Sequence, residues 1–239
     1  MSQVLSKQEQ NIYWKYNATT FSEINEALFT PAYWQARDAV TGQETGRGTT
    51  WFLKHKNHQL VLRHYLRGGL MRHISHDKYI YTGLQNTRSI AEFSILDHLL
   101  KLELPVPRPA AAQVIKQGAV YKADLITHKI PEAQDLVQRL KQKQDADFYH
   151  KLGGVIAQFH RNGVYHADLN IQNILQDLSG QFWLIDFDRA KILMPQHTWQ
   201  QANLKRLKRS FEKERQRYDI CWQDSDWNTF HKGYLDQIK

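Results

Sequence analysis

The sequence predicts an α+β protein of two lobes, with a β-rich N-lobe and a mainly helical C-lobe. Three observations indicate this division. Segments rich in strand-forming residues are concentrated before residue 127, helical segments dominate after residue 145, and a proline-containing break near 127–131 separates them. We therefore place the N-terminal lobe at 1–127, with N-terminal helices, an antiparallel sheet and one further helix. The C-terminal lobe takes 128–239.

The composition is that of a folded protein with anionic partners. Hydrophobic residues make up 41% and charged residues 23% of the 239-residue chain, which excludes a disordered protein. The single cysteine, Cys221, fits a reducing compartment, and neither a secretory h-region nor an apolar run of membrane-spanning length is present in the sequence. We therefore expect a cytoplasmic location. The net charge of +8 favours nucleic acid, phospholipid headgroups or phosphorylated substrates.

The predicted N-terminal lobe begins with two short helices. The first is expected over Ser22–Leu28, and the second, near Ala32–Ala39, follows Thr30 as N-cap and Pro31 as its first residue. The glycines of Gly42–Gly48 predict a loop.

A sheet and one long helix complete that lobe. Residues 49–55 and 59–66 predict a β-hairpin, and residues 114–115 and 120–126 predict a second strand pair around a glycine. Between these pairs, apolar residues at helical spacing predict a helix over 87–102, which the following prolines end.

The C-terminal lobe is predicted to contain a helix over Asp145–Asn162, closed by Gly163 at its C-terminus. A hairpin pairs residues 174–175 with 182–185, and the chain is expected to be helical from about Thr198 onward.

The strongest functional signal is the run His166-Ala167-Asp168-Leu169-Asn170-Ile171-Gln172-Asn173, followed by Asp186-Phe187-Asp188. Kinases place a catalytic Asp after His-x, an Asn five positions later, and a metal-binding Asp in a D-F-G turn beyond. In this sequence His166, Asp168, Asn173 and Asp186 stand at the matching positions, and the loop follows a predicted helix and includes a predicted hairpin. The pattern predicts a bilobal protein-kinase-like fold.

The chemistry of phosphoryl transfer accounts for these residue types. Asp168 is the predicted catalytic base, which accepts the proton of the attacking hydroxyl. The carboxylate of Asp186 and the amide oxygen of Asn173 form a hard oxygen site suited to Mg²⁺, which neutralises the phosphates of ATP. His166 is expected to orient the loop by hydrogen bonding rather than to transfer a proton.

The nucleotide-binding candidates in the N-terminal lobe fit the kinase pattern less closely. Gly46-Arg47-Gly48 is a truncated form of a phosphate-covering loop, for which an ordinary hairpin turn is the alternative. Arg63 stands where kinases carry the ATP lysine, and Glu92 on the next helix is its expected ion-pair partner, with a solvated surface charge as the alternative.

Four segments resemble the Kdo (3-deoxy-D-manno-octulosonic acid) kinases of lipopolysaccharide assembly. They are Arg63-His64-Tyr65-Leu66-Arg67-Gly68-Gly69-Leu70, Ala123-Asp124-Leu125-Ile126-Thr127, His166-Ala167-Asp168-Leu169-Asn170 and Asp186-Phe187-Asp188-Arg189-Ala190. The resemblance covers roughly residues 42–193. It implies ATP-dependent phosphorylation of the 4-hydroxyl of Kdo on a lipid A precursor (Kdo-lipid IVA), with Asp168 as the active-site residue. It also implies a peripheral protein at the cytoplasmic face of the inner membrane.

The sequence departs from protein kinases in ways that favour a small or lipid-linked acceptor. Asp188 replaces the glycine of D-F-G, Asn170 stands where many protein kinases carry Lys, and no A-P-E signature follows. An inner-core heptose kinase and an aminoglycoside-type kinase remain alternatives. So do an inactive nucleotide- or lipid-binding module and, from charge alone, a nucleic-acid binder, although the sequence contains no nucleic-acid-binding motif. No obligate protein partner is expected.

Two basic regions are candidates for contact with the substrate or membrane. Arg67 and Arg72 are proposed to meet the sugar carboxylate or lipid A phosphates, with a solvated basic loop as the alternative. Residues 204–218 predict a basic amphipathic helix, on which Leu204, Leu207, Phe211 and Tyr218 form an apolar stripe. We expect the stripe to pack on the C-terminal lobe and the basic face to meet anionic headgroups.

Overall fold

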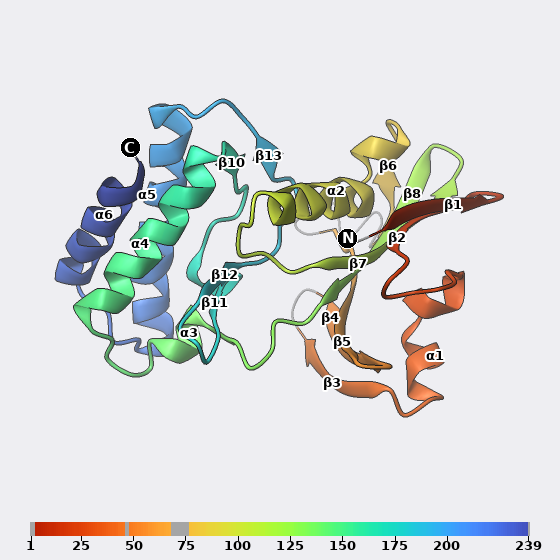
Figure 1. Ribbon diagram of the computed structural model, residues 1–239, viewed down its shortest axis with the longest axis horizontal. Helices are drawn as coiled ribbons and strands as arrows, with labels where there is room; N and C mark the ends of the chain where they lie inside the picture. The colour runs from red at the N-terminus through yellow and green to blue at the C-terminus, as the bar shows by residue number, and fades with distance from the viewer. Residues whose placement is uncertain (1–2, 46–47, 68–76, 239) are drawn as a thin grey trace. The chain divides into compact units, whose positions relative to one another are not determined.

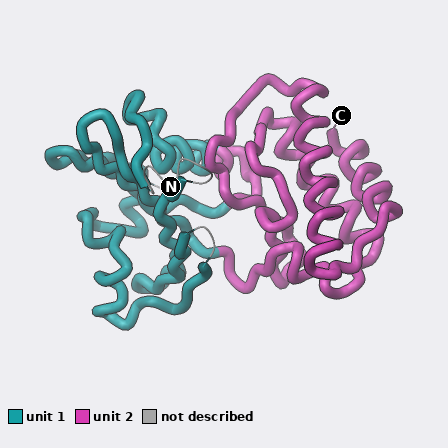
Figure 2. The backbone as a smooth tube through the Cα atoms, turned by 180° about the vertical axis from the view of Figure 1, so that it is seen from behind, with its two compact units in different colours: residues 1–98, 107–129 teal, residues 99–106, 130–239 magenta. Residues whose placement is uncertain are grey.

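The computed structural model describes residues 3–45, 48–67 and 77–238 of the chain. Its contacts divide the chain into two units, shown in different colours in Figure 2. Unit 1 comprises residues 1–98 and 107–129, and unit 2 comprises residues 99–106 and 130–239. Unit 1 contains the large sheet, and unit 2 contains the long helices that follow the sheet in sequence.

An antiparallel sheet forms the framework of unit 1 (Figure 1). Among the described residues its strands lie in the order β1-β2-β7-β8-β5-β4-β3, with β6 paired to β8. The strands are β1 Val4–Glu9, β2 Ile12–Asn17, β3 Val40–Thr45, β4 Thr49–His55, β5 His58–His64, β6 Tyr79–Ile80, β7 Pro109–Gln117 and β8 Val120–His128. The β4–β5 hairpin and the β7–β8 pair confirm the two predicted strand pairs.

Helix α2, Arg88–Lys101, confirms the predicted long helix of unit 1. Its residues Ile90, Phe93 and Leu96 are buried, as their helical spacing requires. Ser89 Oγ donates to the carbonyl of Gln113 in β7, and Lys15 Nζ in β2 donates to Ser94 Oγ. These bonds attach the helix to the neighbouring strands β2 and β7 of the sheet.

The first 45 residues differ from the sequence-based prediction. Residues 4–17, for which no element was predicted, form the β1–β2 hairpin. The helix predicted over Ser22–Leu28 is wrong, because only a 3₁₀ turn, η1 Glu26–Phe29, forms there. Helix α1 is the short segment Pro31–Gln35, with Pro31 at its start as predicted. Thr30 Oγ1 donates backwards to Ala27 instead of capping the helix.

The loop predicted over Gly42–Gly48 is also wrong for its first half. Residues through Thr45 continue strand β3, which pairs with β4 through a bulge near Gly42. A Cβ on Gly42 would only touch Phe52, so a glycine here is compatible with a strand. A second short turn, η3 Leu84–Asn86, precedes α2.

Unit 2 is built on helices with small strand pairs between them. The helices are α3 Leu136–Arg139, α4 Ala146–Arg161, the 3₁₀ turn η4 Ile171–Asn173, α5 His197–Tyr218 and α6 Asp224–Ile238. Strand β11 Ile174–Gln176 pairs with β12 Phe182–Leu184 and β9 Gln134–Asp135, and β10 Val164–Tyr165 pairs with β13 Lys191–Ile192. The predicted hairpin after residue 173 is therefore confirmed.

Helix α4 begins and ends where its sequence signals predict. The Asp145 carboxylate accepts a hydrogen bond from the backbone N–H of Phe148 at 2.8 Å, which satisfies one free donor of the first turn. Gly163, just past the last turn, has φ +71°, a conformation that favours glycine. The chain thus leaves α4 at a fixed point and runs directly into β10 and the predicted catalytic loop.

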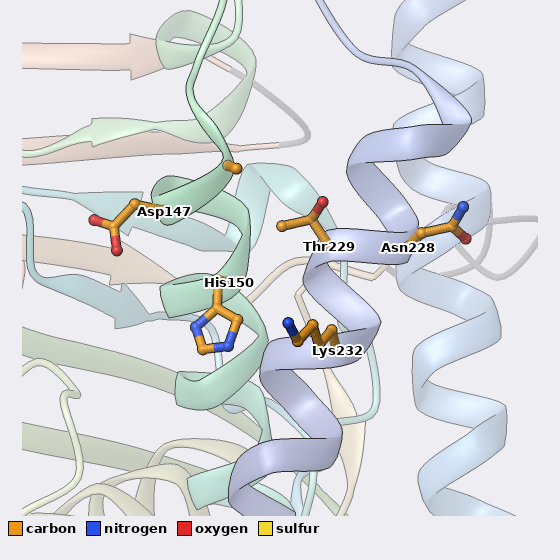
Figure 3. A pocket seen from close by; sticks show the side chains of 6 residues that line it. Asp147, His150, Asn228, Thr229 and Lys232 are labelled. Carbon is orange, nitrogen blue, oxygen red and sulfur yellow. The ribbon is translucent and has the colours of Figure 1, made fainter.

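Helices α4 and α6 lie side by side in unit 2 (Figure 1), and glycines permit their close approach. A Cβ on Gly153 would lie 2.0 Å from the carbonyl oxygen of Phe230, and one on Gly233 would lie 2.0 Å from that of His150. A shallow groove of about 490 Å³ opens between the same two helices (Figure 3). Its lining is Ala146, Asp147, His150, Asn228, Thr229 and Lys232, none of which is a predicted site residue.

Helix α5 is the predicted basic amphipathic helix. Leu204, Leu207 and Phe211 are buried, which confirms that the apolar stripe packs within the fold, whereas Tyr218 is 41% exposed and lies outside the packed part. Among the described residues, no helix combines the length and apolarity that a membrane-spanning segment needs.

Candidate active site

A buried histidine orients the loop that carries Asp168. His166 is 2% exposed, and its Nδ1 accepts the backbone N–H of Asp168 at 3.2 Å. The proton therefore resides on Nε2, which donates to the carbonyl of Ile185 at 3.0 Å. Burial lowers the pKa of His166, so the ring stays neutral in the tautomer that both bonds require. This geometry corresponds to the orienting role predicted for His166.

Two asparagines fold the loop around the main chain of Asp168. Asn170 Nδ2 and Asn173 Nδ2 both donate to the carbonyl oxygen of Asp168, at 3.0 and 2.9 Å. The Oδ1 atom of Asn170 accepts the backbone N–H groups of Gln172 and Asn173, and so caps η4. Because Asn173 uses its amino group on Asp168, its carbonyl oxygen Oδ1 is the atom that remains for a cation.

Ile185 connects this loop to the predicted metal-binding aspartate. Its backbone N–H donates to the carbonyl of Asn173 at 3.0 Å, while its own carbonyl accepts His166 Nε2. The next residue, Asp186, has φ +62°, a left-handed conformation that is uncommon for a non-glycine residue, and Phe187 after it is buried. The backbones that carry Asn173 and Asp186 are thus tied to each other and to the Asp168 loop.

The donor set around this loop fits Mg²⁺. An amide oxygen and a carboxylate are hard ligands, and Mg²⁺ is usually held by one or two carboxylates together with waters and substrate phosphates. Within the described ranges, no cluster of three or more His, Cys, Asp or Glu side chains is gathered for a metal ion. A site of this composition would be completed by the phosphates of ATP.

Helix α5 holds the catalytic loop through polar side chains that were not among the residues predicted from the sequence. Asn203, 1% exposed, accepts from the backbone N–H of His166 at 3.3 Å and donates to its carbonyl at 3.1 Å. Two turns further on, Ser210 Oγ accepts from the backbone N–H of Ile171 at 3.1 Å. Asn203 and Ser210 at i and i+7 share one helix face. Polar residues at the spacing of the apolar stripe were the signal that could have identified them.

The same helix brings a positive charge to the predicted base. Arg206 Nη1 lies 4.0 Å from Asp168 Oδ1, and the two side chains are 42% and 52% exposed. The distance exceeds that of a hydrogen bond, so the guanidinium neighbours the carboxylate without donating to it. Asp168 is therefore accessible, and Arg206 is the cation that the described part of the chain places beside it.

The predicted nucleotide-binding residues lie in unit 1. The expected ion pair is present: Arg63 Nη2 lies 2.6 and 2.7 Å from the two carboxylate oxygens of Glu92. Glu92 is 3% exposed and also accepts the hydroxyl of Tyr65, which excludes the alternative of a solvated surface charge. This pair joins β5 to α2, as the Lys–Glu pair of kinases joins the corresponding strand and helix.

The glycines and arginines predicted to bind nucleotide and substrate belong only in part to the described residues. Gly48 approaches Leu66 so closely that a Cβ would lie 2.7 Å from Leu66 Cδ1, whereas Gly46 lies outside the described residues. Arg67 has its guanidinium carbon 5.2 Å from the centre of the Tyr79 ring, and Arg72 lies outside the described residues. Nucleotide binding by the glycines and substrate binding by the arginines stay predictions.

A chain of hydrogen-bonded polar side chains, buried except at His64, crosses the sheet of unit 1. Asp124, in β8, accepts His64 Nδ1 at 2.6 Å and Gln113 Nε2 at 3.3 Å, and Gln113 Oε1 accepts Trp14 Nε1 at 2.8 Å. The hydrogen bond to Asp124 raises the pKa of His64. His64 and Asp124 belong to two of the segments quoted above for the family resemblance, and here they join β5 to β8.

Comparison with known proteins agrees with this chemistry. Residues 31–234 match the model of the lipopolysaccharide kinase (Kdo/WaaP) family. A 3-deoxy-D-manno-octulosonic acid kinase of Vibrio vulnificus (strain YJ016) is 46% identical over 93% of this chain and 94% of its own length. Enzymes of the same name from Vibrio cholerae (46% over 83% and 82%) and Stenotrophomonas maltophilia strain K279a (42% over 87% and 83%) are also similar.

Proposed function

Because the chain belongs to the lipopolysaccharide kinase (Kdo/WaaP) family, we propose that it transfers the γ-phosphoryl group of ATP to the 4-hydroxyl of a Kdo residue on a lipid A precursor. One observation carries the proposal. Asp168 is half exposed in a loop that is held in place by hydrogen bonds of His166, Asn170, Asn173 and Asn203. A fixed and accessible carboxylate of this kind is what a hydroxyl acceptor requires.

Asp168 acts on the acceptor hydroxyl. Its carboxylate takes the hydroxyl proton while the oxygen forms a bond to the γ-phosphorus, and the bond between that phosphorus and the bridging oxygen of ADP breaks. The bonds from His166 and the two asparagines restrict the loop before substrate arrives, so little reorganisation is needed in the transition state.

Mg²⁺, when bound with ATP, neutralises the charge that develops on the phosphates. Asn173 Oδ1 and the Asp186 carboxylate are the protein atoms that would hold it. In unit 1, Arg63 and Glu92 fix β5 against α2, and Arg63 would supply the charge that a lysine supplies in other kinases. Gly48, with Gly46, would allow backbone to approach the phosphates.

A lipid-linked acceptor requires the enzyme to work at a membrane surface. Ile192, Leu193 and Met194 are 46%, 37% and 81% exposed and follow Lys191, which is also exposed. This short apolar segment, which begins four residues after Asp188, suits shallow insertion beside anionic headgroups. We place the protein at the cytoplasmic face of the inner membrane as a peripheral protein.

A transfer assay with radiolabelled ATP tests the activity and its acceptor. Purified protein is given a Kdo-bearing lipid A precursor, a heptosylated core acceptor or an aminoglycoside. Label should enter only the first, and NMR of the product should place the phosphate on the 4-hydroxyl. Label in the heptose or in the aminoglycoside instead would overturn the proposed acceptor.

Variants of the loop test the assigned roles. Asp168→Asn should lower kcat by at least about 10²–10⁴ while ATP still binds, because only the proton acceptor is removed. Asp186→Asn should weaken binding of Mg²⁺ and ATP as well as turnover. Asp147→Asn, which removes an exposed carboxylate of α4, is the matched control and should leave both unchanged. Wild-type turnover in Asp168→Asn would contradict its role as base.

A further inference from the structure

The catalytic loop has no positive charge of its own beside Asp168. Asn170, which stands where many protein kinases carry Lys, uses its amino group on the Asp168 carbonyl and its Oδ1 on two backbone N–H groups. It is a neutral cap of η4 and has no capacity left for a ligand. Any cation that meets a substrate at Asp168 must therefore come from another part of the fold.

Among the described residues, the cation that lies within 4.0 Å of the Asp168 carboxylate is Arg206. It is placed one turn after Asn203 and one turn before Ser210, the two residues that hold the loop from α5. Its Nη1 is 4.0 Å from Asp168 Oδ1, too far to donate a hydrogen bond, and no hydrogen bond from Arg206 to another described residue is found. The planar fork of N–H groups is thus available to an incoming ligand, and such a fork matches a carboxylate in two-point contact.

A positive charge at this point has a chemical reason if the acceptor is an acid. The attacking hydroxyl must reach Asp168, so the rest of its sugar ring lies within a few ångströms of that carboxylate. A sugar that carries its own carboxylate would be repelled by Asp168 and by the phosphates of ATP. A half-exposed arginine next to Asp168 offsets that repulsion where the sugar must bind.

Resting on the proposed function, we infer that Arg206 binds the carboxylate of the acceptor sugar and thereby makes the enzyme specific for an acidic sugar. The acceptor named for the relatives is an octulosonic acid, in which the carboxylate and the reacting hydroxyl belong to the same ring. Arg206 holds the carboxylate while Asp168 takes the hydroxyl proton. A neutral sugar of the same shape binds poorly, because among the described residues the guanidinium then has no anionic partner apart from Asp168.

The test removes the charge from the protein, from the substrate, and from both. The substrate pair is a Kdo-bearing lipid A precursor in detergent and the same molecule with its Kdo carboxylate converted to the primary amide. In the wild-type protein, kcat/KM should favour the acid over the amide by about 10- to 100-fold, the usual value of a charged hydrogen bond. In Arg206→Gln this ratio should fall to near one. The change should appear as a higher KM for the acid, while KM for ATP stays unchanged.

Two further variants make each outcome decisive. Arg206→Lys keeps the charge without the fork and should give an intermediate ratio. Arg209→Gln removes the same charge from an exposed position of the same helix and should keep the wild-type ratio. If Arg206→Gln does not fold, an unchanged ratio in Arg206→Lys together with an unchanged KM for the acid would overturn the inference.

The result also separates this inference from the proposed function. No transfer to the acid by wild-type protein would refute the proposed function itself. Transfer by the wild type with the same acid-to-amide ratio in Arg206→Gln would refute the role of Arg206 alone. An equal loss of kcat with both acceptors would refute it too, since Arg206 would then act on the phosphoryl group or on Asp168.

Discussion

The contact between α4 and α6 makes a quantitative prediction, because two adjacent glycines of α4 differ sharply in their surroundings. A Cβ on Gly153 would lie 2.0 Å from the Phe230 carbonyl oxygen and 2.7 Å from the Tyr234 nitrogen, both backbone atoms. Since such contacts do not fall below 3.0 Å, Gly153→Ala must push the helices apart by about 1 Å. A gap of that size forfeits a quarter to a half of each interhelical contact.

The expected cost of Gly153→Ala is about 3 kcal/mol from overpacking, partly offset by about 1 kcal/mol from the better helix propensity of alanine. Gly154→Ala is the matched control, because its Cβ would meet the flexible Gln237 side chain at 3.3 Å and would approach a backbone atom, the Gly233 oxygen, only to an ordinary contact distance of 3.9 Å. Gly154→Ala should therefore be stabilised by most of the same helix-propensity gain of about 1 kcal/mol. The two variants should thus differ by about 3 kcal/mol, or about 6–12 °C in the thermal transition. Coincident transitions would refute the close approach of α4 and α6.

Three further predictions concern buried polar groups. Asn203→Ala should destabilise the protein by about 2–4 kcal/mol and lower kcat, because two backbone groups of the loop lose their partner; denaturation and transfer assays check this. Arg63→Met should lower the free energy of unfolding by about 3 kcal/mol, because it leaves the buried Glu92 carboxylate without this partner. Adding Glu92→Gln should recover part of that loss, since the buried charge is then removed; chemical denaturation measures both. Burial lowers the pKa of His160 from 6.5 to about 4, so unfolding takes up a proton below pH 6.5 and stability falls as the pH drops toward 4. The loss from this residue is about 2 kcal/mol at pH 5 relative to pH 7.5, and His160→Gln should remove that part of the pH dependence.

The elements predicted correctly from the sequence are those with local signals. Helix α4 has an Asp cap at its start and Gly163 at its end, and both act as the residue types suggest. The β4–β5 hairpin has strand-forming residues on both sides of a tight turn at Lys56, which has φ +52°. The catalytic loop was identifiable because its spacing is imposed by chemistry as well as by folding.

The N-terminal hairpin was missed because its stability is not local. Strand β1 is an edge strand with mostly exposed residues, so its sequence lacks the apolar alternation that predicts a strand. Strand β2 is fixed by pairing with β7, from Ile12 opposite Ile115 to Tyr16 opposite Ala111, about one hundred residues away. Pairing between segments so far apart in the chain overrides local propensity. It therefore cannot be predicted from a short stretch of sequence.

Helix α5 shows what the sequence of a charged amphipathic helix can and cannot predict. Its periodicity predicts which face is buried, and Leu204 and Phe211 are buried as expected. Periodicity does not reveal which residues lie opposite the polar side chains at the border of that face. The prediction therefore assigned the whole basic face, which includes Arg206, to anionic headgroups. The fold places it 4.0 Å from Asp168 instead. The catalytic loop contains the residues that phosphoryl transfer by a kinase needs, whereas the positive charge beside Asp168 comes from Arg206 on a separate helix. Acceptor specificity can therefore change through α5 without a change in the catalytic loop, and this is why the loop motif alone left several kinase acceptors open.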